Sequence, residues 1–495
     1  MAIVHVPGQT KKPAMPPLDP RTVAPAWGWR QPGAGRASYV GAAPEYQATT
    51  VQGCGLFPFM AGSGSPIAGV PIGRHQLYGE VVCLDPLEWV RVGLITNPGV
   101  FVLGQPGVGK SAITKRLVTG MSAFGTRALI LGDLKPEYSP LVRHLGGQVI
   151  RVGRGLDRIN PLDAGPLGRA LDRMSGPAAD RLRLEVHGRR LSLLLALCAL
   201  VRGHGLSNAE EVIIGKAVRI TVDKLGDRDP TVLDVLKTLE TPTDYMLKAA
   251  RTTNEKEYFA EVRDLTFTLD LLVSETMAGI FDGPTTTPLN LDAPAVSVDI
   301  SAVASSDDKL IAAAMLCTWA YGHAMVDAAA VLAEVGLGPR HQFLAVMDEL
   351  WRALKGTSGL VEHADALTRL NRQRGMASMM ITHSMKDLAA LPTEEDRNRA
   401  TGFVERSAIT VLAGLPLAEL EVVTKIRQLT EPEMHLVKSW ASPESWMRGV
   451  AHPGRGKYLI KTGDRLGIPV ELSLVGDEPR LYDTDAAMRL DEVQR

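Results

Sequence analysis

Residues 104–111 read Gly-Gln-Pro-Gly-Val-Gly-Lys-Ser, a complete G-x-x-x-x-G-K-[ST] phosphate-binding loop. An apolar, β-branched run at 99–103 precedes the loop and predicts a buried strand, and apolar residues at helical spacing follow it from 112 to 121. In this order of strand, loop and helix, backbone N–H groups and the helix dipole bind the phosphates of a nucleoside triphosphate. The alternative, a glycine-rich turn without a ligand, leaves the adjoining Lys110 and Ser111 unexplained.

The loop also predicts which residues contact the nucleotide. Lys110 is expected to reach the β- and γ-phosphates, and the Ser111 hydroxyl is expected to bind Mg²⁺. ATP and Mg²⁺ are therefore the expected cofactors. The residues expected to bind the nucleotide are Gly104, Gln105, Pro106, Gly107, Val108, Gly109, Lys110, Ser111 and Ala112.

Length and composition limit the classes of protein to consider. A chain of 495 residues is too long for one compact core, and 45% hydrophobic with 22% charged residues is typical of a globular protein. The net charge of −1 gives no basis for bulk binding of nucleic acid, and the four cysteines lack the paired spacing of a metal site. The longest apolar run, 193–201, is shorter than the ~20 residues of a membrane span, so no direct membrane insertion is expected.

Strand and helix signals alternate along most of the chain. After 99–103, buried strands are expected at 127–133, 148–152, 295–300, 343–347, 378–382 and 408–413, whereas helical periods dominate 167–280. This pattern predicts an α/β fold with a mostly parallel sheet covered on both faces and an all-helical insertion. The expected organisation is an extended or disordered arm (1–50), a small β-rich lead-in (51–98), the first part of the core (99–166), the insertion (167–280), the second part of the core (281–475) and a C-terminal tail (476–495).

A pair of carboxylates follows the strand expected at 343–347. Asp348 and Glu349 come directly after its apolar residues, at the end where open α/β sheets bind their ligands. Solvated acids at a strand end are common, but a complete phosphate loop in the same chain favours a functional role. Asp348 is then expected to hold Mg²⁺, and Glu349 to orient and deprotonate the attacking water.

Polar and basic residues flank the strand expected at 378–382. Thr382 or His383, at its end, is a candidate to hydrogen bond to the γ-phosphate or the attacking water, although a lone histidine there is more often structural. Upstream, Arg372 and Arg374 are candidates for an arginine finger that enters a neighbour's site in a ring of subunits. A solvated basic turn is the alternative for the two arginines.

Several stretches together resemble the motor ATPases of type IV secretion and conjugation, the VirB-four or TraC kind, within the FtsK/HerA superfamily. Besides the phosphate loop, these stretches are Leu-Phe-Pro-Phe at 56–59, Asp-Leu-Lys-Pro-Glu-Tyr at 133–138, Leu-Gly-Gly at 145–147, Ile-Asn-Pro-Leu at 159–162, Gly-Ile-Phe-Asp-Gly at 279–283 and Asp-Glu-Leu-Trp at 348–351. The resemblance extends from about residue 51 to the C-terminus. The Asn-Pro-Leu and Asp-Glu-x-Trp elements make it more specific than the phosphate loop alone.

The resemblance implies a RecA-like P-loop ATPase core and gives roles to individual residues. It implies that Lys110 and Ser111 bind phosphate and Mg²⁺, that Asp348 binds Mg²⁺, and that Glu349 is the base. It also favours Arg372 over Arg374 as the finger, because the family's arginine precedes its sensor by about a strand's length. The family's sensor is typically Gln after Thr, and here His383 occupies that position.

The resemblance further implies a function and partners. Such proteins are usually hexamers at the cytoplasmic face of the bacterial inner membrane, where they are held by channel components of a secretion or conjugation apparatus. The leading hypothesis is therefore an ATP-hydrolysing motor that drives substrate translocation or pilus assembly. The first alternative is a duplex-DNA translocase of the same superfamily, with DNA as its partner. A second is a structural subunit that binds nucleotide but scarcely hydrolyses it, against which the four intact residues Lys110, Ser111, Asp348 and Glu349 argue.

Overall fold

A computed structural model describes residues 65–274, 277–303, 307–354, 371–391, 393–441 and 452–483. These residues all belong to one compact unit, 65–495. The arm expected at 1–50, the Leu-Phe-Pro-Phe stretch at 56–59 and the last twelve residues of the expected tail lie outside the described residues.

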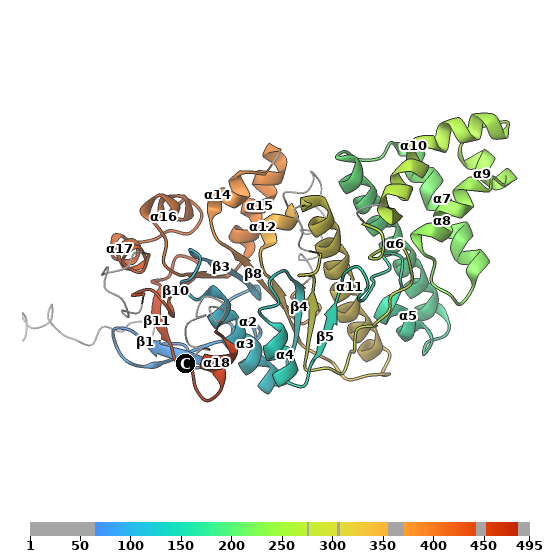
Figure 1. Cartoon of the computed structure of the whole chain (residues 1–495). Coiled ribbons are helices and arrows are strands. Elements are labelled where there is room, and N and C mark those ends of the chain that lie inside the picture. The colour runs from blue at the N-terminus through green and yellow to red at the C-terminus, as the bar shows by residue number, and fades with distance from the viewer. Residues whose placement is uncertain are drawn as a thin grey trace, which may run out of the picture. The chain divides into compact units, whose positions relative to one another are not determined.

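The described strands form one sheet (Figure 1), in the order β2-β1-β11-β10-β9-β3-β8-β7-β4-β6-β5. A parallel part comprises β9 (Ile409–Leu412), β3 (Gly99–Leu103), β8 (Met376–Thr382), β7 (Phe343–Met347), β4 (Arg127–Asp133), β6 (Ala295–Asp299) and β5 (Gln148–Arg151). An antiparallel part adds β10 (Lys457–Thr462), β11 (Ile468–Leu472), β1 (Val70–His75) and β2 (Val81–Leu84). The predicted α/β fold with a mostly parallel sheet is confirmed.

Helices cover both faces of the parallel part, which explains why its strands are apolar throughout. In β3, Val100 and Val102 pack on one side of the sheet, and Phe101 and Leu103 pack on the other. The first side is covered by α2 (Pro86–Arg91), α3 (Lys110–Ala123) and α4 (Ser139–His144). The second is covered by α11 (Asp308–Glu334), α14 (Met385–Ala389), α15 (Glu394–Arg406), α16 (Leu417–Thr424) and α17 (Glu431–Ser439). Two-sided burial of this kind is typical of parallel sheets.

The chain between β5 and β6 is helical, with no strand among its described residues. Its elements are α5 (Gly165–Leu171), α6 (Pro177–Arg202), α7 (Asn208–Leu225), α8 (Val232–Glu240), α9 (Asp244–Ala249) and α10 (Glu255–Val273), which lie beyond β5 and α11 in Figure 1. Two of these helices begin with capping boxes, Ser207 with Glu210 and Thr231 with Asp234. In a capping box, each of the two side chains accepts a hydrogen bond from a backbone N–H that the helix leaves unpaired.

The long helix α11 is the single described helix that is long and apolar enough to cross a membrane. However, 94% of its most apolar stretch is buried inside the protein. It packs on β4 and against α5 and α6. Burial on this scale is what a central core helix shows, and α11 fills the space between the sheet and the helical segment.

The C-terminal hairpin of β10 and β11 does not appear among the strands expected from the sequence. β10 pairs with β9, and β11 pairs with β1, so the hairpin joins the N-terminal strands to the parallel sheet. The strands of the expected lead-in therefore extend the same sheet. The remaining short helices are α12 (Leu350–Leu354) and α18 (Glu478–Leu481).

Candidate active site

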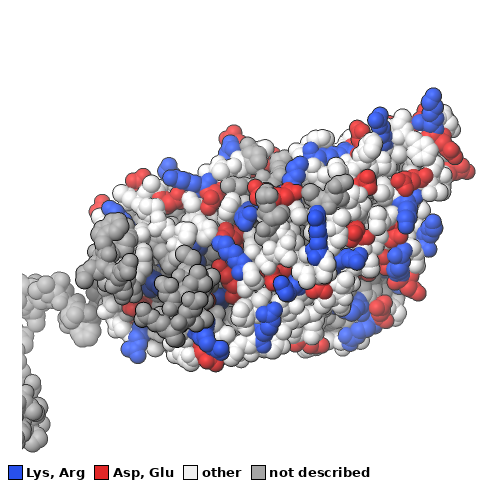
Figure 2. Space-filling model, viewed as in Figure 1, with Lys and Arg blue, Asp and Glu red and all other residues white. Residues whose placement is uncertain are grey.

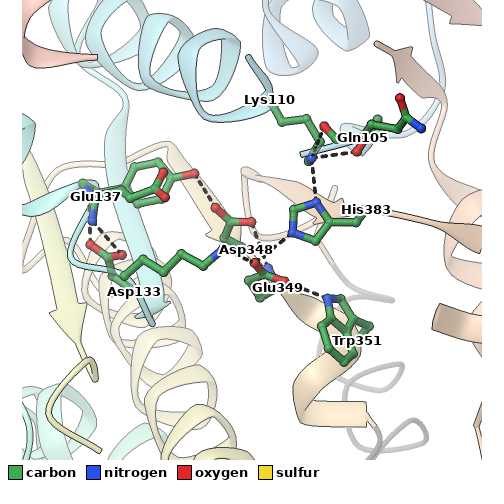
Figure 3. Close-up of polar contacts among 11 residues, drawn as sticks. Gln105, Lys110, Asp133, Glu137, Asp348, Glu349, Trp351 and His383 are labelled. Carbon is green, nitrogen blue, oxygen red and sulfur yellow. Dashed lines mark hydrogen bonds and ion pairs between the residues drawn. The ribbon is translucent and has the colours of Figure 1, made fainter. Parts of the chain in front are cut away.

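The strand order brings three chemically distinct strand ends together. β8 lies between β3 and β7, and all three strands run in the same direction. Their carboxyl ends lead into the phosphate loop, His383 and Asp348, respectively. The carboxyl ends of adjacent parallel strands meet at one edge of a sheet, so side chains far apart in sequence converge there (Figure 3).

The phosphate loop needs its glycines for backbone conformation and space. Gly107 and Gly109 have φ angles of 83° and 99°, a region that side chains disfavour. A Cβ atom on Gly109 would lie 2.9 Å from the hydroxyl oxygen of Tyr458, which donates a 2.6 Å hydrogen bond to the Gly109 carbonyl. The loop ends where α3 begins at Lys110, so the N-terminus of this helix lines the cleft in which phosphates are expected to bind.

Lys110 is buried against its own loop. Its Nζ donates to the carbonyl oxygens of Gly104 at 2.7 Å and Gln105 at 2.9 Å, and lies 2.7 Å from Nδ1 of His383 (Figure 3). Burial lowers the pKa of Lys110 to about 8, although the Asp348 and Glu349 carboxylates oppose this shift. The ammonium group is thus held at the site by acceptors that a phosphate oxygen can replace.

Glu349 is surrounded by donors and held in an unusual backbone conformation, with a φ of 52°. Lys135 donates to its Oε1 at 2.8 Å, Trp351 donates to its Oε2 at 2.7 Å, and Nε2 of His383 lies 3.0 Å from Oε1. Burial by itself would raise the pKa of Glu349, but the hydrogen bonds from His383 and Lys135 hold it well below its ordinary value. The carboxylate is therefore ionised and fixed in direction.

Asp348 is held by a tyrosine and by its own chain neighbour. The Tyr138 hydroxyl donates to Oδ2 at 2.8 Å, and the Glu349 N–H donates to Oδ1 at 2.9 Å. Burial raises the pKa of Asp348, with the Glu349 and Glu137 charges adding to the effect. A buried carboxylate of this kind gains from a nearby cation.

The donor set fits Mg²⁺. No group of three or more His, Cys, Asp or Glu that could hold a metal occurs in the part of the chain that the structure describes. Mg²⁺ is commonly bound by one or two protein oxygens, with phosphates and waters as the other ligands. Ser111 and Asp348 both line the cleft described below and supply such oxygens.

The site lies in a cleft of about 510 Å³ whose second wall comes from the C-terminal segment. Arg455, Leu472 and Tyr482 are among the residues on that wall. An ion pair between Arg116 and Glu478 fixes this segment to α3. No motif marked these residues in the sequence, since they reach the loop only because the hairpin folds back beside β9.

Other contacts that sequence reasoning missed involve residues within the recognised stretches. Lys135 and Tyr138 lie in the 133–138 stretch and Trp351 in the Asp-Glu-Leu-Trp stretch, yet only the structure shows that they contact Glu349 and Asp348. The stretches indicated that these residues matter, but they did not indicate what each residue contacts.

The two arginines lie far from this site. They belong to the turn that precedes β8, whereas His383 follows its other end, so the seven residues of β8 separate them from the cleft by about 20 Å. Arg372 is exposed, and Arg374 forms an ion pair with Asp327, with Nε 2.6 Å from Oδ1. Of the site residues expected from the sequence, the structure thus brings all but Arg372 and Arg374 to one edge of the sheet.

Comparison with solved structures identifies the fold. VirB4 of Thermoanaerobacter pseudethanolicus matches with a TM-score of 0.63 and 20% sequence identity, over 84% of this chain and 100% of that chain. The chain has the fold of VirB4. The resemblance that the sequence motifs indicated is thereby confirmed at the level of the fold.

A second solved structure is less similar to this chain than VirB4 is. The plasmid coupling protein TrwB, in complex with ADP and Mg²⁺, matches with 12% identity and a TM-score of 0.47, over 77% of this chain and 86% of that chain. No protein-family model and no curated protein sequence matches the chain.

Proposed function

We propose that this chain is an ATP-hydrolysing motor that works as a ring, a homo-hexamer, and energises conjugative transfer or type IV secretion. One observation carries the hydrolytic part of this proposal. His383, directly after β8, lies between the phosphate-binding Lys110 and the carboxylate of Glu349, within hydrogen-bond distance of both. A loop for phosphates, a fixed carboxylate and a group that contacts both are the parts that phosphoryl transfer to water requires.

Each residue at the cleft has its own role in ATP hydrolysis. Lys110 and the backbone N–H groups of the loop bind the β- and γ-phosphates. Glu349, ionised and held by three donors, orients a water and accepts its proton. His383 is placed to donate to the γ-phosphate or to the attacking water once Lys110 moves to the nucleotide. Mg²⁺, bound by Ser111 and Asp348, would neutralise charge on the phosphate oxygens.

A ring of subunits would give Arg372 a role despite its distance from its own cleft. An exposed arginine about a strand's length from its own cleft cannot reach its own nucleotide, because an arginine side chain spans roughly 7 Å against about 20 Å of strand. In a head-to-tail ring, the same side chain faces the cleft of a neighbour. Arginine supplies two parallel donors to a phosphoryl group, which suits it to that place. These features support Arg372 as a finger that acts across the subunit interface.

The VirB4 fold and the sequence motifs support a role in secretion or conjugation. In that role the ring stands at the cytoplasmic face of the bacterial inner membrane and is held there by channel components. Direct action on duplex DNA is less well supported. The face in Figure 2 shows Lys and Arg interspersed with Asp and Glu, and the whole chain carries a net charge of −1. Proteins that track DNA present concentrated positive charge instead.

ATP hydrolysis by purified protein across a range of protein concentrations tests the proposal. Specific activity should rise with concentration in the wild type and stay low and flat in Arg372→Ala, since a shared site needs a neighbour. Glu349→Gln should bind a fluorescent ATP analogue normally and hydrolyse ATP about 10²- to 10⁴-fold more slowly. Glu255→Gln, an exposed change on α10, is the matched control and should behave as wild type.

Each alternative function predicts a different result. Wild-type turnover no faster than that of Glu349→Gln would indicate a structural subunit. Strong stimulation by added duplex DNA would favour a DNA translocase. Activity that depends neither on concentration nor on Arg372 would contradict the shared site.

A further inference from the structure

The turn that carries Arg372 is firmly attached at its base. The Gly375 N–H donates to the Arg372 carbonyl at 3.3 Å, and the Met376 N–H donates to Asn371 at 2.9 Å. The Gly375 carbonyl in turn accepts from the Phe343 N–H of β7 at 3.1 Å. The backbone of the turn is thus tied to the sheet.

Asp327 of α11 connects this turn to the helical segment. Its Oδ1 lies 2.6 Å from Nε of Arg374, and its other oxygen forms an ion pair with Arg189 of α6. Arg189 lies 3.4 Å from Glu185 as well. The Asp327 carboxylate is only 7% exposed, so one nearly buried acid holds two arginines from different parts of the fold. A charge pair screened from water in this way is costly to break by removing one partner.

A cavity of about 460 Å³ adjoins these side chains. Both Arg189 and Arg374 line it, together with apolar residues of α11 such as Ala320 and Ala324. Close packing is therefore incomplete where α6 approaches the turn. The ion pairs at Asp327 bridge the two parts along the edge of this gap.

We propose that Asp327 and Arg374 are positioning residues for Arg372, and that Arg189 makes the helical segment part of the same support. Arg374 keeps the turn against α11, and this fixes the direction of the exposed Arg372 side chain. The inference rests on the proposed function, in which Arg372 acts on a neighbour's nucleotide. It adds that the finger's orientation depends on a buried carboxylate and on the helical segment. The two arginines of the turn thus have different roles: Arg372 is the finger, and Arg374 positions it.

Steady-state kinetics of the 495-residue chain tests whether Asp327 and Arg374 position Arg372. A misplaced catalytic group costs about 10²-fold in rate, so Asp327→Asn and Arg374→Ala should each lower kcat by that order while KM changes by about twofold at most. Arg374→Lys should recover part of the lost kcat, because it keeps the charge but not the planar fork. Glu210→Gln is the matched control. It breaks a comparably buried pair with Arg202 inside the helical segment, away from the turn, and should retain wild-type kcat.

Mixing two inactive variants distinguishes support of the finger from a general structural defect. Asp327→Asn keeps an intact Glu349 but lacks a positioned finger, and Glu349→Gln has the reverse defect. Random mixing in a ring places an intact cleft beside an intact finger at about one interface in four, so activity should return in the mixture. Recovery also requires that the Asp327→Asn subunit be folded and bind ATP.

The outcomes separate this inference from the proposed function. A mixture of Arg372→Ala with Glu349→Gln should recover in the same way, and failure of that mixture would remove the finger and this inference together. If that mixture recovers while Asp327→Asn alone keeps wild-type kcat, the inference is wrong and the proposed function stands. Recovery of the Arg372→Ala mixture without recovery of the Asp327→Asn mixture would likewise overturn the positioning role, since Asp327 would then serve its own cleft.

Discussion

Nζ of Lys110 lies 2.7 Å from Nδ1 of His383. An ammonium group can only donate, so Nδ1 accepts and the imidazole carries its proton on Nε2, which then donates to Glu349 at 3.0 Å. The histidine therefore connects the lysine that we propose binds phosphate to the carboxylate that we propose positions water. A change at the phosphates that moves Lys110 also changes the hydrogen bonding of Glu349.

Replacement of His383 should lower the rate of hydrolysis more than the affinity for nucleotide. His383→Ala removes a group that contacts both sides of the reaction, and we expect kcat to fall by about 10²-fold with little change in KM. His383→Gln can still offer a donor and an acceptor, so it should lie within about tenfold of wild type. Steady-state ATPase assays measure both. Equal losses in the two variants would mean that the hydrogen-bonding capacity of His383 is not what matters.

Trp351 should contribute through its indole N–H. Trp351→Phe keeps an aromatic ring but removes the 2.7 Å hydrogen bond to Glu349, and a bond to a charged acceptor is worth enough for about a tenfold fall in kcat. Single-turnover hydrolysis with excess protein would isolate the chemical step. An unchanged single-turnover rate would show that His383 and Lys135 suffice to orient the carboxylate.

The Tyr138 hydroxyl should strengthen the binding of Mg²⁺. Tyr138→Phe removes the hydroxyl that donates to Asp348, and loss of a group that orients a metal ligand weakens metal affinity by about tenfold. The Mg²⁺ concentration for half-maximal ATPase activity should rise accordingly. Tyr458→Phe, the same change at the hydroxyl that contacts the Gly109 carbonyl, should leave the Mg²⁺ dependence unaltered.

The Tyr458 hydroxyl should instead strengthen the binding of ATP. Its hydroxyl donates to the Gly109 carbonyl at 2.6 Å, and removal of one such hydrogen bond should raise the Kd for ATP by about fivefold. Titration with a fluorescent ATP analogue measures this directly. Tyr138→Phe is now the control, and an equal loss of affinity in both variants would show that neither tyrosine has a separate role.

A buried ion pair away from the cleft should make stability depend on pH. Glu433 of α17 accepts from Lys461 at 3.0 Å and is, like Lys461, nearly buried. Glu433→Gln leaves the lysine charge without its counter-charge, and we expect a loss of about 3 kcal/mol in the free energy of unfolding at pH 7. Glu431→Gln, exposed on the same helix, should cost less than about 0.5 kcal/mol.

The sign of the pH effect follows from the pKa of Glu433. Burial opposes ionisation, but hydrogen bonds from Thr430, Gly467 and Lys461 outweigh it and lower the pKa below the ordinary glutamate value. The stabilisation is therefore complete above that ordinary value and is lost as the pH falls through the lower folded-state pKa. Urea unfolding of wild type and Glu433→Gln should converge under acid conditions. A difference that stays constant with pH would exclude the ion pair as its source.

Much of the parallel sheet was predictable because its signals are local. The strands expected at 99–103, 127–133 and 343–347 match β3, β4 and β7 residue for residue. These strands are buried on both faces and therefore read as continuous apolar runs. The C-terminal hairpin is different, since β10 and β11 mix charged and apolar residues and depend on pairing with β9 and β1. The pairing of β11 with β1 joins parts of the chain separated by hundreds of residues, such as Gly73 and Leu472.

The phosphate loop, the carboxylates after β7 and the chemistry proposed for them could be predicted from local sequence, because a motif and its flanking strand lie within about twenty residues. The position of β8 between β3 and β7, which lets His383 contact both Lys110 and Glu349, is known from the folded structure alone. The folded structure likewise gives Arg374 a partner in Asp327 and leaves Arg372 exposed. Strand order and the partner of a given charged side chain arise from contacts between distant segments, which no local pattern of residues encodes.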